Sequence, residues 1–117
     1  MRAKFALAAC ALLAFAAPGV ASDANLYSGE QLFQDCTSTY PSHLPNIACG
    51  GYAVGISDVL AGGNTVNGFK ACPPASVTRG QVIKVVTAYL QQHPDGRHFA
   101  AAGLVANALA DAFPCPK

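Results

Sequence analysis

Apolar residues recur at helical spacing after Thr78 and define the first arm of a helical hairpin. They fall three or four residues apart, which places them on one face of a helix. These positions are Val82, Val86, Tyr89 and Leu90. Thr78 and Gln81 have the spacing of a capping box, in which each side chain bonds a backbone N–H at the helix start. Because Pro94 cannot continue a helix, the pattern predicts a helix between Thr78 and Pro94.

A second arm, from about Arg97 to Phe113, carries the same pattern. Its apolar positions are Ala101, Leu104, Val105, Ala108, Leu109 and Ala112. Only the short connection 93–96 separates the two arms, which predicts that they lie antiparallel. That arrangement would bring Cys72, just before the first arm, close to Cys115, just after the second.

A short helix is predicted near the start of the folded part. Ser28 and Gln31 repeat the capping-box spacing. The helix should end before Tyr40, because a residue that precedes a proline avoids helical angles. The side chains expected to be buried are Leu32, Phe33 and Cys36.

Another helix is predicted over roughly 47–60, with Asn46 as its cap. Its apolar stripe consists of Tyr52, Ile56, Val59 and Leu60. Gly51 and Gly55 lie four residues apart, and we expect them to let a neighbouring helix or aromatic ring approach closely. With the two arms, this gives an all-α fold: a small four-helix domain.

Residues 1–21 have the pattern of a bacterial-type secretory signal peptide. Arg2 and Lys4 precede an apolar run that small residues close. The candidate cleavage points lie after Ala21, Ser22 and Ala24. The stretch that ends at Cys10 also resembles a lipoprotein signal, although the apolar run continues past it. The run is too short to cross a membrane and no later segment supplies a span, so 22–117 are expected to form one helical domain in the periplasm.

Removal of the leader changes the sign of the net charge. The whole chain has seven Lys and Arg against six Asp and Glu, a net charge of +1. Two of those seven bases, Arg2 and Lys4, lie in the leader, so the domain carries −1. A domain without a basic face is poorly suited to phosphates, which argues against nucleic acid as a partner.

The domain keeps four cysteines, at Cys36, Cys49, Cys72 and Cys115. An even number in a small exported domain indicates two disulfides. Four cysteines allow three connectivities, and the cysteine spacing alone does not choose among them. The order of the helices favours Cys36–Cys49, between the first two helices, together with Cys72–Cys115. No pair has the close spacing of a zinc knuckle, so no metal site is predicted.

The segment 61–71 is a candidate recognition loop. Its glycines and asparagines favour turn conformations, and recognition residues are often found on such loops. A plain connector fits the same composition. The candidate partner contacts are Asn64, Asn67, Phe69 and Lys70. Tyr40 and His43, in the preceding loop, form a second candidate surface.

Sequence motifs for catalysis are absent. The chain has no Gly-rich phosphate loop, no nucleophile elbow and no His-Glu metal motif. His93, Asp95 and His98 cluster at a helix-to-helix turn, where capping and surface hydrogen bonding suit them better than catalysis. The sequence therefore predicts a protein that is not an enzyme and needs no cofactor.

A long string of matched positions carries a resemblance to a known family. It includes Val77-Thr78-Arg79-Gly80-Gln81, Tyr89-Leu90, His93-Pro94, Arg97-His98 and Ala112-Phe113-Pro114-Cys115, with Cys49-Gly50-Gly51-Tyr52 upstream. Through these residues the chain from Leu26 to Cys115 resembles the Rap/Tai family of type VI secretion immunity proteins. The resemblance implies a small all-helical periplasmic protein that binds and inhibits a peptidoglycan amidase toxin, a cysteine amidase delivered by neighbouring cells. It implies no catalytic residues, because the family has none.

Several alternatives stay open beside this resemblance. The residues by themselves predict only an exported, disulfide-bonded helical binding protein of unknown partner. A periplasmic acid-stress chaperone is one alternative, and an immunity-like domain that no longer binds a toxin is another. A chaperone would expose apolar surface on acidification, whereas an inhibitor would form a stoichiometric complex at neutral pH. A homodimer is also open.

Overall fold

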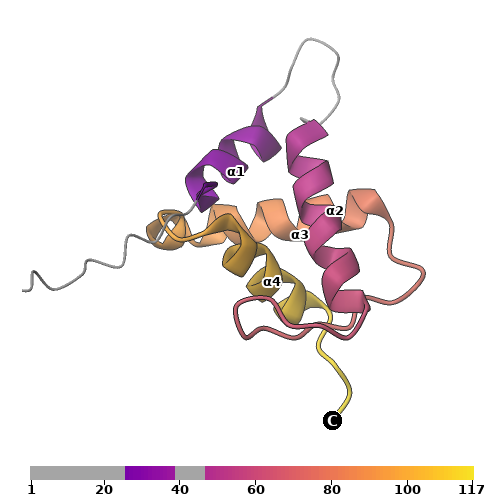
Figure 1. The fold of residues 1–117 in the computed structure, drawn as a ribbon. Coiled ribbons are helices and arrows are strands. Elements are labelled where there is room, and N and C mark those ends of the chain that lie inside the picture. Colours follow the sequence, from indigo (N-terminus) through magenta and orange to yellow (C-terminus); the bar gives the residue numbers. More distant parts are fainter. Residues whose placement is uncertain (1–25, 39–46) are drawn as a thin grey trace, which may run out of the picture.

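The computed structural model describes residues 26–38 and 47–117, and within these ranges it is all-helical. Figure 1 shows its elements, which are α1 (Gly29–Thr37), α2 (Ile47–Ala61), α3 (Arg79–Gln92), the 3-10 turn η1 (Pro94–Gly96) and α4 (Ala101–Ala112). The predicted all-α four-helix domain is confirmed. The predicted leader, the Asn46 cap, and the candidates Tyr40 and His43 lie outside the described residues.

The starts of α1 and α3 follow the predicted capping boxes. In α1, the Ser28 hydroxyl accepts from the backbone N–H of Gln31, and the Gln31 side chain accepts from that of Ser28. Thr78 and Gln81 make the same reciprocal pair at the start of α3. Each box satisfies N–H groups that have no partner inside the helix, so these starts are fixed locally.

The core forms where the four helices meet, each in contact with the other three. The predicted face of α3 is confirmed, with Val82, Val86 and Leu90 buried and Tyr89 half-buried. The predicted stripe of α4 is buried from Ala101 to Leu109, whereas Ala112 is exposed. α1 contributes Leu32, which is fully buried, while Phe33 and Cys36 are half-buried.

The buried face of α2 differs from the predicted stripe. The residues that it buries are Cys49, Gly50, Ala53, Ser57 and Leu60. Val59 is exposed, and Tyr52 and Ile56 are only half-buried. The reason is close packing, since small side chains let the neighbouring helices lie near the α2 backbone. The role expected for Gly51 and Gly55 is also wrong, because both face open space, while Gly50 lies against the Arg79 guanidinium.

The start of α4 also differs from the prediction, since the helix begins at Ala101 and not near Arg97. Glu30 N donates to the Arg97 carbonyl at 2.7 Å, and Gly29 N donates to the Phe99 carbonyl at 2.9 Å. Ala101 N in turn donates to the Tyr27 carbonyl at 3.0 Å. The segment before α4 therefore stays non-helical because its carbonyls cap the first turn of α1.

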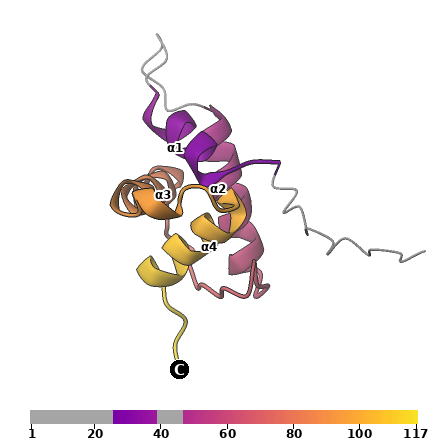
Figure 2. The ribbon, with the colours of Figure 1, turned by 90° about the vertical axis from the view of Figure 1, so that its left-hand side faces the viewer.

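The two disulfides have the predicted pairing. Cys36–Cys49 joins α1 to α2, and Cys72–Cys115 joins the segment before α3 to the segment after α4, with Cα–Cα distances of 5.0 and 4.9 Å. Figures 1 and 2 show α4 running back toward the start of α3 at an oblique angle, with α1 lying across the opposite end. Cys72 N also donates to the Phe113 carbonyl at 2.8 Å, which closes the open end of the hairpin.

Candidate partner-binding surface

The connection between α2 and α3 bends back across α4 (Figure 1). Gly63, Asn67 and Gly68 have positive φ angles of 87°, 48° and 80°, so the glycines and one asparagine adopt the left-handed turns that the sequence predicted. Val66 and Phe69 exchange backbone hydrogen bonds of 3.1 and 2.9 Å across a tight turn. The loop is therefore a folded structure with its own hydrogen bonds.

Asn67 holds this loop against α4. Its side-chain amide lies over Gly103, and a Cβ built at Gly103 would be 2.6 Å from Asn67 Nδ2. Phe69 is half-buried and packs, with Val66, against the core. Two of the four loop candidates thus lie toward the protein itself.

Three of the four loop candidates are exposed, and Asn67 is one of them. Lys70 is exposed, and so is Asn64, whose side-chain amide donates to the Val59 carbonyl at 3.2 Å. Asn64, Asn67 and Lys70 are thus accessible on the surface, although the Asn67 amide also lies against α4, and Phe69 is half-buried.

Two adjoining hollows lie beside the loop and the start of α4. The loop hollow, of about 490 Å³, is lined by Asn67, Phe69, Phe99, Ala100, Gly103, Leu104 and Asn107. The η1 hollow, of about 310 Å³, lies next to the 3-10 turn and includes Tyr89, His93 and Asp95 in its lining. Phe99, Leu104 and Asn107 line both hollows, so the two form one continuous surface.

Phe99 is a surface residue that the sequence analysis missed. Its side chain is 59% exposed, and it is the single aromatic among the large apolar side chains exposed in the described ranges. It falls inside the arm that was expected to be helical, where an apolar residue is ordinarily assigned to the core. Its backbone contact with α1, which depends on the tertiary structure, is what turns this segment outward.

The predicted cluster of His93, Asp95 and His98 lies at the turn, as surface structure. The His93 ring stacks on Tyr89 with a centroid distance of 4.0 Å, and its Nδ1 lies 2.7 Å from the Tyr89 carbonyl. The His98 ring packs against Phe99 at 4.1 Å. The rings of Tyr89, His93 and Phe99 line the η1 hollow.

Tyr89 connects α3 to α4 beneath this surface. Its hydroxyl accepts a hydrogen bond of 2.7 Å from Asn107 Nδ2. Burial, and then the nearby carboxylate of Asp111, raise the pKa of Tyr89 above its ordinary value, while the Asn107 bond lowers it. The hydroxyl therefore stays neutral at physiological pH and acts as a hydrogen-bonding group.

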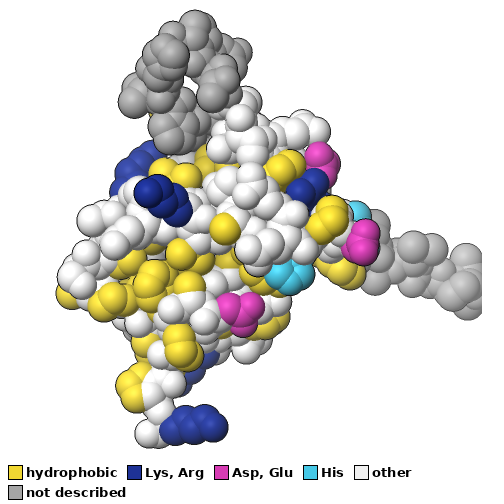
Figure 3. Space-filling model, turned by 180° about the vertical axis from the view of Figure 1, so that it is seen from behind, with side chains coloured by type: hydrophobic (Ala, Val, Ile, Leu, Met, Phe, Trp, Pro, Cys, Tyr) yellow, Lys and Arg dark blue, Asp and Glu magenta, His cyan; other side chains and the backbone are white. Residues whose placement is uncertain are grey.

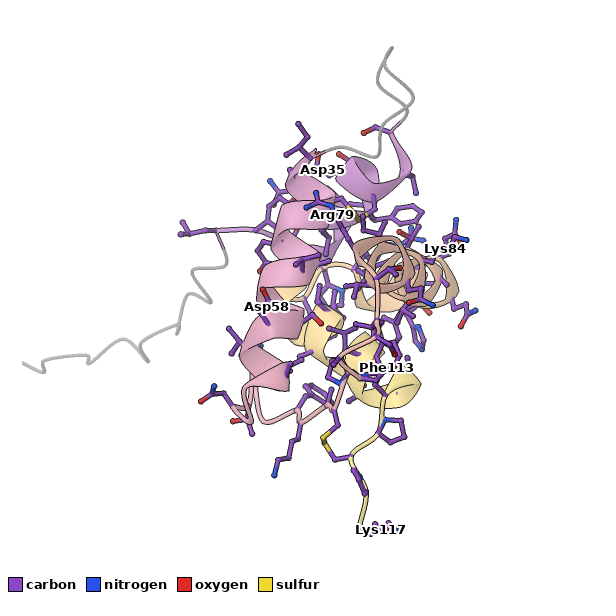
Figure 4. All side chains as sticks on the ribbon, turned by 90° about the vertical axis from the view of Figure 1, so that its right-hand side faces the viewer. Asp35, Asp58, Arg79, Lys84, Phe113 and Lys117 are labelled. Atoms are coloured by element: carbon purple, nitrogen blue, oxygen red, sulfur yellow. A yellow bond between two sulfur atoms is a disulfide. The ribbon has the colours of Figure 1, made fainter. Side chains whose placement is uncertain are left out.

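A third hollow, of about 430 Å³, lies between α3 and the end of α4. Val77, Val85 and Phe113 give it an apolar floor, and Lys84 stands at its edge (Figure 4). Figure 3 shows apolar side chains gathered on this face, with basic side chains above them. This hollow is separate from the loop, and none of the four described contact candidates lines it.

Potential metal ligands are scattered over the described part of the chain. No group of three or more His, Cys, Asp or Glu there could hold a metal ion. The four cysteines of the domain are all joined in disulfides. Over the same residues, no helix is long and apolar enough to cross a membrane.

The fold and this surface define a class of small, disulfide-cross-linked helical domains with a grooved surface beside a structured loop. Residues 28–115 match the family model of the Rap1a immunity proteins, a range that holds all four helices and both disulfides. The chain belongs to this family. Its membership indicates an immunity function against a secreted toxin and a toxin as the binding partner, and such families are generally non-catalytic. Two disulfides and this family are both consistent with an exported protein.

The other comparisons add nothing to this assignment. No curated protein and no solved structure matches the chain.

Proposed function

We propose that this protein is a periplasmic immunity protein that binds and occludes a type VI secreted peptidoglycan amidase. The observation that carries the proposal is the family match over residues 28–115. The resemblance of the chain to the Rap/Tai proteins supplies the finer assignment to an amidase toxin. The leader predicted at 1–21 and the two disulfides support the periplasmic location, because disulfides persist in oxidising compartments.

Inhibition works by steric occlusion, with the loop and the adjoining surface of α4 covering the toxin's substrate cleft. The support is a rigid scaffold: Asn67 fixes the loop on α4 and the Cys72–Cys115 disulfide holds the loop's far end. A preorganised surface loses little conformational entropy on binding, which favours tight association. Asn64, Asn67 and Lys70 are the exposed candidate contacts on the loop, with Tyr40 and His43 as the second candidate surface.

The test uses a purified amidase encoded beside this gene and the full mature chain. Inhibition at neutral pH should saturate near one binding site per enzyme. Thr65→Arg places a long side chain on the exposed loop and should weaken inhibition by about tenfold or more, as blocking a central contact does. Ser76→Arg, an exposed position at the third hollow, is the matched control and should inhibit like wild type.

Each result separates one part of the proposal from another. Amidase activity that wild type leaves unchanged would remove the immunity function against this toxin. Equal inhibition by wild type and Thr65→Arg would place the contact away from the loop. Binding of unfolded client proteins only on acidification would favour the chaperone alternative.

A further inference from the structure

We propose that Phe99 is the central anchor of the toxin-binding surface, and that it enters an apolar recess with a basic rim on the toxin. This inference rests on the proposed function and names the residues that carry it. Its basis is an exposed aromatic on a rigid backbone, beside two continuous hollows whose described lining residues include no Lys or Arg.

The backbone around Phe99 is fixed from both sides. Its carbonyl accepts from Gly29 N at 2.9 Å and its N–H donates to the Gly96 carbonyl at 3.1 Å. Arg97, two residues earlier, donates from Nε to the Leu90 carbonyl at 2.7 Å and lies 3.6 Å over the Phe33 ring. These contacts tie the segment to α1 and α3, so the Phe99 side chain is presented in one orientation.

Exposure of a large aromatic on such a backbone costs solvation energy in the free protein. Burial of the exposed part of the Phe99 ring against a partner would remove apolar surface from water, which favours association. Interface anchors are typically aromatic, preorganised and surrounded by groups that exclude water. Phe99 has this setting, because His98 packs on its ring and the two hollows adjoin it.

The charges around Phe99 select the partner's chemistry. Asp95 lines the η1 hollow, Asp111 lies near Tyr89, and neither hollow has a Lys or Arg in its lining among the described residues. Arg97 is the nearby base, but its guanidinium is turned toward Phe33 and pairs with Glu30 at 3.8 Å. Figure 3 shows acidic and histidine side chains at this end of the molecule.

The Asp95 carboxylate on this surface carries a negative charge, as does the substrate of the proposed toxin. Peptidoglycan stem peptides carry free carboxylates, so a cleft that binds them presents basic groups around an apolar recess. An aromatic ring beside a hollow that the Asp95 carboxylate lines is complementary to such a cleft, and complementary charge favours association and orientation. The occupant is therefore the mouth of the amidase cleft.

The experiment measures the inhibition constant of four variants against the purified amidase, with the melting temperature of each. Phe99→Ala should weaken inhibition by about tenfold or more, because it removes the anchor. Asp95→Lys should weaken it by about fivefold or more and reduce its salt dependence, because it opposes the basic rim. The matched controls are Ile47→Ala, an exposed apolar residue at the far end of α2, and Asp58→Lys, an exposed acid on α2. All four melting temperatures should equal that of wild type, because the substituted side chains are exposed.

The outcomes distinguish this inference from the proposed function. If wild type and Phe99→Ala inhibit equally, the anchor is elsewhere while the immunity function stands. The assignment of a basic rim would be overturned if Phe99→Ala weakens inhibition but Asp95→Lys does not. It would also be overturned if Asp95→Lys and Asp58→Lys weaken inhibition equally. If wild type does not inhibit, the proposed function and this inference both fail.

Discussion

The side-chain amide of Asn67 lies directly over Gly103, which joins a loop after α2 to the face of α4. A Cβ at Gly103 would be 2.6 Å from Asn67 Nδ2 and 3.5 Å from its Cγ. Glycine in the middle of a helix lowers stability by about 1 kcal/mol relative to alanine. The glycine at this position is thus explained by the space that the loop needs.

This contact predicts a coupling between the two positions. Gly103→Ala in the wild-type background should displace the loop. The stabilisation of about 1 kcal/mol that alanine usually gives over glycine inside a helix should therefore be lost or reversed. In an Asn67→Gly background the obstructing side chain is absent, and the positive φ at position 67 suits glycine. Gly103→Ala should then stabilise the fold as alanine usually does. Urea unfolding of the four proteins measures the coupling. Equal stabilisation by Gly103→Ala in both backgrounds would show that Asn67 does not press on α4.

Two glycines in different surroundings should respond in opposite directions to alanine. At Gly29, a Cβ would meet a methyl group of Leu104 and lie 2.9 Å from the Arg97 carbonyl oxygen, so Gly29→Ala should cost about 1–3 kcal/mol. Gly55 faces open space on α2, so Gly55→Ala should stabilise by up to about 1 kcal/mol. Melting temperatures would then move down and up respectively. A lower value for Gly55→Ala would place an unseen neighbour against α2.

The two disulfides should contribute unequally to stability. In the chain-entropy model, the 43-residue separation of Cys72 and Cys115 is worth about 4 kcal/mol, and the 13-residue separation of Cys36 and Cys49 about 3 kcal/mol. Against a total of about 5–15 kcal/mol for a domain, Cys72→Ala with Cys115→Ala should lower the urea midpoint strongly. The matched comparison is Cys36→Ala with Cys49→Ala. A larger loss for this second pair would show that packing of the fully buried Cys49 outweighs loop closure.

Alkaline pH should destabilise the fold through Tyr27. Burial, and then the hydrogen bond that its hydroxyl donates to Asp35, raise the pKa of Tyr27 well above its ordinary value of 10.0. The folded state therefore holds the proton more tightly, and its stabilising effect is complete below pH 10 and declines as the pH rises above it. Tyr27→Phe keeps the ring but not the titrating group, so its unfolding free energy should fall less steeply above pH 10. Parallel pH profiles for the two proteins would exclude Tyr27 as the cause.

Most of the predicted fold depended on interactions between near neighbours in the sequence. The capping boxes at Ser28 and Thr78 formed as predicted, because each needs only residues three positions apart. The disulfide pairing followed from the order of the helices, since consecutive helices joined by short connections bring their ends together. The family resemblance likewise needed only matched positions along the chain, and the match over 28–115 confirmed it.

Three features were decided only by the tertiary structure. α2 buries a face that consists, apart from Leu60, of small side chains. Small side chains give little hydrophobic signal in the sequence, so the pattern of apolar residues does not reveal this face. α4 begins at Ala101 because the carbonyls of Arg97 and Phe99 cap α1, about seventy positions away in the sequence. The same contact turns Phe99 outward. The sequence by itself determined which segments are helical and how they are cross-linked; long-range hydrogen bonding decided which side chains remain exposed for a partner.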